Sequence, residues 1–465
     1  MVSRIYSFAL PLIIYFVIQY LIKSPDSLSK EAWSLFAIFS STIGALITKP
    51  LPTGSIAVIT LAVVTTTGTI PIQTALDGFA SPVIWLILTV CLIARSIIKV
   101  GLSNRIAYTF AKMFGSSKVG LSYCIILTDV LIAPFVLSPT ARAGGILMPV
   151  YNSMANFVID KKESSELRNF LSAVYVQTTC IVGAMFLTST SGNPLIHKIA
   201  LEQGISITWM SWFIAAFIPA IVCLILLPHL VKRYFLYDLP SSVDFKKLAT
   251  AKLANLGKIT IKEWTVVAVL VGILYLWIYG PKYGISQVSS TLIGLSVLLI
   301  TKILTFEEIL EEKEAWNIFV WFAVIVMLSQ NLQSCGVITY FSEIFKGLIP
   351  HQNWYIGLLT ITLVYFYSHY FFAGALSHIS SMYGIFLSLA LGIGAPPILS
   401  ALVLAFASSL FMALTPYAGA STALIFSNSS IPILKWWKMN FSISGINLFI
   451  WSTIGVVWWK ILGLW

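Results

Sequence analysis

The stretch that decides the fold is F-V-L-S-P-T-A-R-A-G-G at residues 135–145. Apolar runs flank it on both sides, so a polar patch that carries Arg142 falls inside a hydrophobic region. Backbone in a bilayer leaves the helical form only where it lines a cavity or is buried in protein. A Ser-Pro-Thr break followed by arginine therefore predicts a binding site, because an intramembrane charge is functional by default. The alternative is that Pro139 only kinks a helix and that Arg142 pairs with Asp129 to hold a hairpin.

The composition places the whole chain in a membrane. Of its 465 residues, 58% are hydrophobic and 10% are charged, whereas soluble proteins carry roughly 25% charged residues. The net charge of +11 comes from basic residues spread between apolar spans. This is the positive-inside pattern, and it argues against nucleic-acid binding. The five cysteines lie in or at the ends of apolar runs without CxxC spacing, which predicts packing roles and no metal site.

The order of the apolar spans predicts an all-α polytopic membrane protein. We interpret the span at 7–21 as a transmembrane helix, because no small-x-small cleavage site of a signal peptide follows it. A basic segment at 232–262 predicts a cytoplasmic linker between a first transmembrane repeat, 1–231, and a second, 263–465. The spans predict about 11 transmembrane helices plus two re-entrant hairpins, with the N-terminus inside and the C-terminus outside.

The two halves of the chain repeat each other. V-I-W-L at 83–86 aligns with F-V-W-F at 319–322, and the same offset of 236 residues carries Arg142 onto His378. The second half thus has its own interrupted element, F-A-G-A-L-S-H-I-S-S-M at 372–382, with a basic residue in the corresponding position. The alternative is a coincidental similarity between two apolar halves.

A second pair of polar breaks supports the repeat. T-S-T-S-G-N-P at 188–194 has a looser counterpart in L-T-P-Y-A-G-A at 414–420. Interrupted hydrophobic segments in corresponding positions of two halves are the best sequence pointer to a transporter site at the bilayer midplane. An odd number of helices in each half would make the repeats inverted.

Four segments, in the right order, resemble the divalent anion:sodium symporter superfamily: S-P-T-A-R-A-G-G-I-L-M-P at 138–149, M-F-L-T-S-T-S-G-N-P-L at 185–195, residues 378–383, and W-W-K-I-L-G-L-W at 458–465. The resemblance covers nearly the whole chain and is closest to the branch of 2-oxoglutarate/malate translocators and citrate/succinate antiporters. It implies a carrier of dicarboxylates, without enzyme activity or cofactor, that works as a homodimer by an elevator mechanism. It also implies a bacterial inner membrane or a plastid envelope, and the absence of a transit peptide favours the bacterial membrane.

The chain departs from the family's signature in both repeats. The family carries S-N-T there, and its polar groups hold sodium and substrate carboxylates. The copies here are S-P-T at 138–140 and G-A-L at 374–376, so the second offers no side-chain oxygen. Sodium is a hard cation that needs several oxygen ligands, as calcium does. The departures therefore predict sodium-independent transport, with a residual sodium site possible only at Ser138 and Thr140.

A dianion inside a membrane needs positive charge, helix N-termini or hydrogen-bond donors in place of water. The predicted substrate-binding residues belong to the interrupted segments: Ser138, Thr140, Arg142, Ser191, Gly192, Asn193, Pro194, Ser377, His378, Thr415 and Pro416. Arg142 and His378 are predicted to act as fixed cations in place of sodium, although His378 could equally be an ordinary hydrogen-bonded histidine. A charge at the bilayer centre costs at least about 2.5 kcal/mol. An empty site with an arginine would therefore cross slowly, which predicts an exchanger.

Three other functions stay open. One is a sodium- or proton-coupled symporter of di- or tricarboxylates. The second is an intramembrane enzyme, but the sequence has neither HExxH nor paired carboxylates. The third is a channel, which saturable counterflow would exclude. The expected partners are small dicarboxylate anions, the lipid bilayer and a second copy of the chain.

Overall fold

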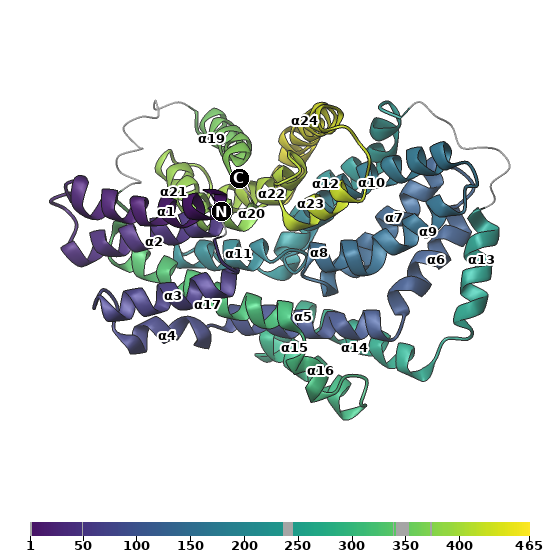
Figure 1. Cartoon of the computed structure of the whole chain (residues 1–465), viewed down its shortest axis with the longest axis horizontal. Coiled ribbons are helices and arrows are strands. Elements are labelled where there is room, and N and C mark those ends of the chain that lie inside the picture. The colour runs from purple at the N-terminus through teal and green to yellow at the C-terminus, as the bar shows by residue number, and fades with distance from the viewer. Residues whose placement is uncertain (1, 49, 236–244, 338, 341–352, 373) are drawn as a thin grey trace.

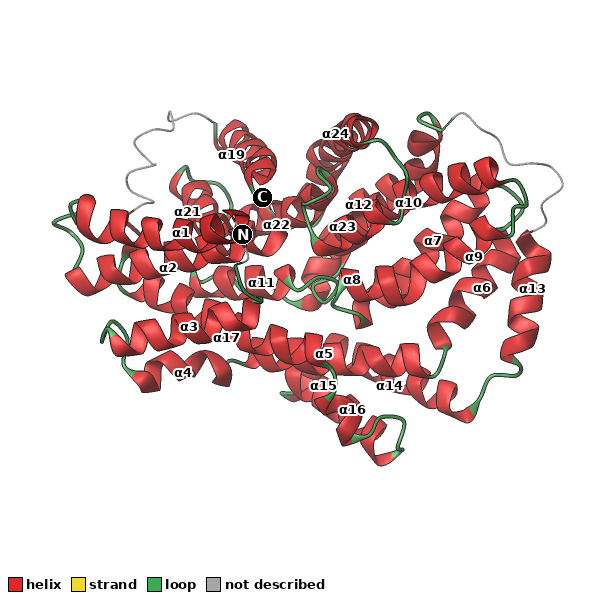
Figure 2. Cartoon of the chain, viewed as in Figure 1, coloured by secondary structure: helices red, strands yellow, loops and turns green. Residues whose placement is uncertain are grey.

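The computed structural model describes residues 2–48, 50–235, 245–337, 339–340, 353–372 and 374–465. Every regular element in these residues is a helix (Figure 2). Seven of the described helices are long and apolar enough to cross a membrane, and four shorter helices are also apolar. The predicted all-α membrane fold is confirmed, whereas the figure of about 11 spans stays a prediction. Two predicted segments lie partly outside the described residues: the linker at 236–244 and the second interrupted element at Ala373.

The helices of the first half, with their 3-10 and π-helical turns (η), are α1 (Val2–Phe16), η1 (Val17–Leu21), α2 (Lys30–Thr48), α3 (Thr53–Thr66), α4 (Ile72–Ala80), α5 (Pro82–Lys99), α6 (Leu102–Phe114), α7 (Lys118–Ile132), η2 (Ala133–Phe135), α8 (Pro139–Arg142), η3 (Ala143–Leu147), α9 (Met148–Asn156), α10 (Lys161–Met185), α11 (Gly192–Glu202) and α12 (Trp209–Lys232).

The remaining elements are α13 (Phe245–Leu256), α14 (Ile261–Tyr279), η4 (Gly280–Tyr283), α15 (Gln287–Ile300), α16 (Phe306–Leu310), α17 (Lys313–Ser334), α19 (Trp354–Ser368), η5 (His369–Phe371), α20 (Ala375–His378), η6 (Ile379–Tyr383), α21 (Gly384–Gly392), α22 (Pro397–Leu410), η7 (Phe411–Ala413), α23 (Ala420–Ser427), α24 (Ile433–Ile450), η8 (Trp451–Gly455) and α25 (Val456–Ile461).

The sequence repeat is present as two runs of elements in the same order. An offset of 236 residues carries α7 onto α19, η2 onto η5, α8 onto α20, η3 onto η6 and α9 onto α21, with both ends matching in each pair. In both halves a four-residue α-helix follows a break and passes into a five-residue π-helical turn. Arg142 and His378 each end that short helix. The predicted pair of interrupted segments is therefore confirmed.

The corresponding helices α5 and α17 pack against each other in opposite directions. Trp85 near the start of α5 contacts Phe319, with ring centroids 5.4 Å apart. Arg95 near the end of α5 forms an ion pair with Glu312, just before α17 begins, at 2.8 Å. The later residue of α5 thus meets the earlier residue of the α17 segment. This opposed direction is what inverted repeats require.

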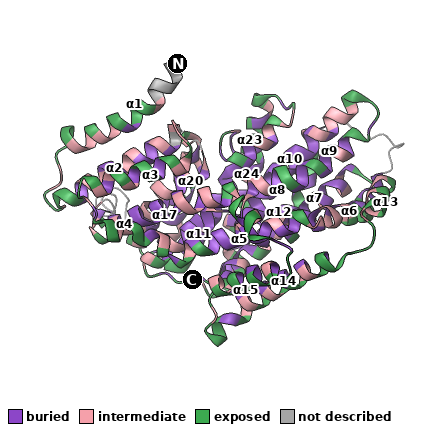
Figure 3. Cartoon of the chain, turned by 60° about the horizontal axis from the view of Figure 1, so that its bottom comes forward, coloured by how far each residue is buried: buried purple, intermediate pink, exposed green. Residues whose placement is uncertain are grey.

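Figure 1 shows the helices in two layers. The lower layer contains α3, α4, α5, α14, α15 and α17, and α8, α10, α11, α22 and α23 lie above it. Buried residues gather where α5, α10, α11 and α12 meet, while the outer faces of α1, α13 and α14 are exposed (Figure 3). Every residue of α10 from Phe170 to Met185 is buried. A helix that is covered on all sides belongs to the core of a large protein, so α10 is the central helix.

Local capping signals explain where several long helices begin. Asp160 caps α10 by accepting hydrogen bonds from two backbone N–H groups of its first turn. Thr208 begins α12 with a capping box, and Thr260 begins α14 in the same way together with Glu263. Such side chains satisfy N–H groups that have no partner within the helix. Glu263 also accepts from Arg105 at 2.6 Å, which ties α14 to α6.

Gly78 gives a test of the packing between α4 and α17. Small residues let membrane helices approach each other closely. A methyl group added at Gly78 would therefore collide with the backbone carbonyl of Ala323 on α17. Gly78→Ala is expected to lower stability by about 1–3 kcal/mol through overpacking. The measurement is thermal denaturation of purified protein in detergent. Gly272→Ala on α14 is the matched control, since it meets open space; equal melting temperatures for both variants would contradict the packing described here.

Candidate functional site

Four helices that follow chain breaks begin at one cavity. The first residues of α8, α11, α20 and α23 line it, so each half of the chain contributes two helix N-termini. Because α8 continues through η3 into α9, and α20 through η6 into α21, these two ends begin helical segments that extend over 139–156 and 375–392. The cavity measures about 250 Å³. This is just below the range of roughly 300–1,000 Å³ for drug-sized ligands, so the cavity suits a small solute.

The two signature segments form their breaks by different local means. Ser138 has an extended backbone, and its Oγ accepts from the backbone N–H of Ala141 at 3.1 Å. Pro139 then occupies the first helical position, where its missing N–H costs nothing. In the second half, Gly374 has a φ of 131°, which strains any residue with a Cβ. The glycine that replaces the family's serine there matches this backbone.

The helix N-termini give the cavity an anion-binding character. Each carries roughly half a positive charge from its aligned peptide groups. The N-caps of α11, α20 and α23, which are Ser191, Gly374 and Gly419, make no side-chain capping hydrogen bond. Ser421 adds a buried hydroxyl that has no hydrogen-bond partner within the described part of the chain. Helix N-termini that no side chain caps, together with a hydroxyl that lacks a partner, offer suitable donors for carboxylate oxygens.

The opposite wall of the cavity comes from α3 and α17. Asn317 on α17 accepts from the backbone N–H of Gly54 and donates to Thr53, both at 3.0 Å. Glu314 on the same helix accepts a hydrogen bond from Ser138 at 2.9 Å. Among the described residues that line the cavity, Glu314 is the one charged side chain, and no lysine, arginine or histidine lies among them.

The structure brings five of the predicted site residues to the cavity: Ser138, Thr140, Ser191, Gly192 and Ser377. The other six do not line it: Arg142, Asn193, Pro194, His378, Thr415 and Pro416. Asn193 instead donates to the backbone carbonyls of Gly183 and Phe186, at 2.7 and 2.8 Å. It thereby satisfies carbonyl groups at the end of α10 and supports the break before α11.

Arg142 lies behind the cavity in a buried ion pair. Both Arg142 and Asp129 are 0% exposed, and Nε of the arginine donates to the Asp129 carboxylate at 2.8 Å. Its other nitrogens donate to the backbone carbonyls of Val136 and Ser189 and to the Thr179 hydroxyl. The ion pair considered as the alternative from the sequence is therefore present. Direct contact between Arg142 and a substrate stays a prediction, and this geometry does not support it.

His378 lies in an aromatic cluster. Its ring stacks on Tyr365 with centroids 4.6 Å apart, and its Nε2 lies 2.9 Å from the Ser368 hydroxyl. The side chain is buried, and its Nδ1 has no hydrogen-bond partner in the described residues. These surroundings suit the hydrogen-bonded histidine that the sequence left open. A role for His378 as a fixed cation at the substrate stays a prediction.

Several polar residues at the cavity were missed by the sequence reasoning: Thr53, Thr190, Glu314, Asn317, Ser380 and Ser421. Thr190 and Ser380 fall within the polar breaks already identified, and Ser421 directly follows one. The breaks themselves were therefore a usable signal for these three. Glu314 ends the acidic run at 307–314, and Asn317 lies in the apolar span that follows it. No local pattern shows that either residue faces the breaks.

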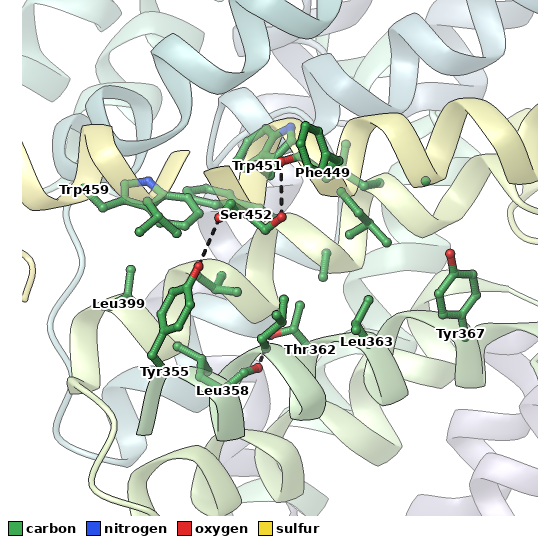
Figure 4. A pocket seen from close by; sticks show the side chains of 18 of the residues that line it. Tyr355, Leu358, Thr362, Leu363, Tyr367, Leu399, Phe449, Trp451, Ser452 and Trp459 are labelled. Atoms are coloured by element: carbon green, nitrogen blue, oxygen red, sulfur yellow. Dashed lines mark hydrogen bonds between the residues drawn. The ribbon is translucent and has the colours of Figure 1, made fainter. Parts of the chain in front are cut away.

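A second cavity, of about 300 Å³, lies between α19, α22 and the helices of the C-terminus (Figure 4). Its lining is almost entirely apolar and includes Leu358, Leu363, Trp451 and Trp459. No charged residue lines it in the described part of the chain. An ionised carboxylate without partners is very costly to bury. This apolar cavity is thus unsuited to an anion, whereas the cavity at the four helix N-termini is the candidate site.

An all-α membrane protein in which two corresponding pairs of broken helices begin at one cavity is a secondary transporter. The chain matches, over residues 3–465, the family described as "Sodium:sulfate symporter transmembrane region", and it belongs to this family. It is an integral membrane transporter and not an enzyme.

The relatives match along nearly the whole chain. YflS of Bacillus subtilis (strain 168) is 40% identical over 469 residues, which cover 100% of this chain and 97% of the relative. "Dicarboxylate transporter 1, chloroplastic" of Spinacia oleracea is 40% identical over 456 residues, covering 97% and 80%. "Inner membrane protein YbhI" of Escherichia coli (strain K12) is 30% identical over 469 residues, covering 98% and 97%.

Solved structures support the fold. The Alcanivorax borkumensis YdaH transporter superposes with a TM-score of 0.57 at 12% identity, over 98% of this chain and 97% of that one. Neisseria gonorrhoeae MtrF superposes with a TM-score of 0.55 at 13% identity, over 98% and 94%. At such low identity the likeness concerns the fold alone.

Proposed function

We propose that this protein transports dicarboxylates of the 2-oxoglutarate, malate and succinate type across the membrane. The observation that carries the proposal is the meeting of four helix N-termini at one small cavity lined by hydroxyl groups. Four N-termini supply roughly two positive charges, which matches a dianion without any basic side chain. The name of the Spinacia oleracea relative, a dicarboxylate transporter, also supports this substrate class.

We further propose that transport occurs by exchange and without sodium. An uncompensated Arg142 would slow the return of the empty transporter, but Asp129 compensates this charge in the structure. Ligands for a cation are instead scarce in the second repeat, because residues 374–376 line the cavity without a side-chain oxygen. Hard cations require several oxygens. Where no co-transported ion binds well, an opposing dicarboxylate gradient remains as the driving force.

The arrangement of the walls supports an elevator motion. The broken helices form one side of the cavity, and α3 and α17 form the other. Movement of the first set past the second would carry a bound solute between the two sides of the membrane. We also propose a homodimer in a bacterial inner membrane, by analogy with the family branch that the sequence resembles.

One observation favours a sodium-coupled symporter as the second candidate. The Glu314 carboxylate lies 2.9 Å from the Ser138 hydroxyl, so it adds an anionic oxygen to the residual sodium site predicted at Ser138 and Thr140. Carboxylate and hydroxyl oxygens suit hard cations. A sodium dependence of uptake would distinguish this candidate from the exchanger.

The test is uptake of radiolabelled 2-oxoglutarate or succinate into proteoliposomes, with internal malate present or absent and with external sodium or choline. Uptake is expected to require internal malate and to be the same in choline. Uptake that follows sodium and needs no internal dicarboxylate would favour the symporter. Saturable counterflow is also expected, since a carrier must alternate its access; unsaturable flux would indicate a channel.

A further inference from the structure

The one charged side chain among the described cavity-lining residues has a sign opposite to that expected for an anion site. Glu314 is solvent-exposed and begins the polar wall formed by α17. Its Oε1 accepts the hydrogen bond from Ser138, the first residue of the first signature. The Glu314 carboxylate therefore accepts the hydrogen bond that we expect the Ser138 hydroxyl to donate to a substrate carboxylate.

Ser138 cannot serve both carboxylates at once. A serine hydroxyl has a single hydrogen to donate, and here it points to Glu314. The same oxygen already accepts from the backbone N–H of Ala141. A substrate carboxylate that binds Ser138 must therefore displace Glu314. Two carboxylates held in one small cavity also repel each other, which favours movement of Glu314 away from Ser138 when a substrate enters.

Two basic residues of the neighbouring helix α5 already have acidic partners before α17 begins. On α5, Arg95 pairs with Glu312 at 2.8 Å and with Glu311 at 3.5 Å. Lys99, one turn further on, donates to Glu308 at 2.7 Å. These pairs join α5 to the segment before α17 and lie outside the cavity lining. Among the acidic residues of this segment, Glu314 is thus the one whose carboxylate is directed to the broken helices.

We propose that Glu314 competes with the substrate for Ser138. We also propose that the Glu314–Ser138 contact keeps the broken helix α8 of the empty transporter from moving past α17. This inference rests on the proposed function. The contact links the wall formed by α17 to the broken helix α8, the two parts that an elevator motion would separate. Substrate breaks the contact and releases the motion, whereas an empty site keeps it. Return of the empty transporter is then slow, which makes transport an obligatory exchange.

The test compares Glu314→Ala and Glu314→Gln with wild type in proteoliposomes, using radiolabelled 2-oxoglutarate in choline buffer. Net uptake is measured in liposomes without internal dicarboxylate, and exchange uptake is measured with internal malate. The ratio of net uptake to exchange uptake is then compared between variants. Wild type is expected to show a low ratio. E314A removes the hydrogen bond between Ser138 and the Glu314 carboxylate. This loss is expected to raise the ratio about tenfold and to tighten the equilibrium binding of 2-oxoglutarate by a similar factor. Glu311→Ala is the matched control, because it removes the same charge outside the cavity.

The outcomes separate this inference from the proposed function. Wild type without counterflow, or with equal net and exchange uptake, would overturn both. Wild-type exchange with an unchanged ratio in E314A would overturn the role of Glu314 alone. Loss of exchange in both E314A and E314Q, with the protein still eluting as a single folded species, would also overturn it, since the carboxylate would then act with substrate bound. A raised ratio in E314A but not in E311A supports the inference.

Discussion

Arg142→Met is expected to destabilise the protein by about 3–5 kcal/mol, the cost of leaving one member of a buried ion pair alone. The methionine leaves the Asp129 carboxylate without its guanidinium partner in a fully buried position. The backbone carbonyls of Val136 and Ser189 lose their donors in the same change. Melting temperature and yield of monodisperse protein in detergent measure the effect, and we expect little folded protein.

The double variant Arg142→Met with Asp129→Leu is the control for this assignment. Replacing both members of a buried pair by apolar residues is often neutral or even stabilising, so the double variant is expected to recover part of the lost stability. The following outcome would instead support the substrate-binding role that the sequence predicted for Arg142. If R142M melted like wild type but failed to bind 2-oxoglutarate, Arg142 would have to be a substrate ligand.

Ser191→Asp is expected to lower the affinity for 2-oxoglutarate roughly 30-fold while the protein stays folded. Ser191 is the N-cap of α11 and lines the cavity. Aspartate is a favoured N-cap, and its charge complements the helix dipole, so the helix itself should be at least as stable. The new carboxylate would meet a dianion in the same cavity. Two unit charges 4 Å apart repel by about 4 kcal/mol at an effective dielectric constant of 20. A repulsion of half that size, about 2 kcal/mol, lowers the affinity for 2-oxoglutarate roughly 30-fold.

Ser117→Asp is the matched control for this experiment. Ser117 is the N-cap of α7, it is exposed, and its side chain accepts from the backbone N–H of Gly120. The chemical change and the helical position are the same, but the cavity is not involved. At a 2-oxoglutarate concentration near the wild-type KM, exchange should be retained in S117D and strongly reduced in S191D. Equal exchange by both variants would contradict the assignment of the cavity as the anion site.

Some features of this protein were determined by the sequence alone because they depend on neighbours along the chain. The membrane class follows from the length and composition of apolar spans. The breaks follow from Pro139 and Gly374, which act on their own backbone. The repeat needs only a constant offset, and 236 residues places five corresponding elements onto one another. Ser138, Thr140, Ser191 and Ser377 were identifiable as site residues because they lie at those breaks.

Other features were decided only by the tertiary structure, because they depend on distances between segments far apart in the sequence. Arg142 pairs with the buried Asp129, and an apolar sequence pattern does not show which of the two predicted contacts this arginine makes. Glu314 lies 176 residues after Ser138 in the sequence, yet its carboxylate accepts a hydrogen bond from the Ser138 hydroxyl at the cavity. Helix packing places the two side chains together, and helix packing is set by the three-dimensional fit of many side chains at once.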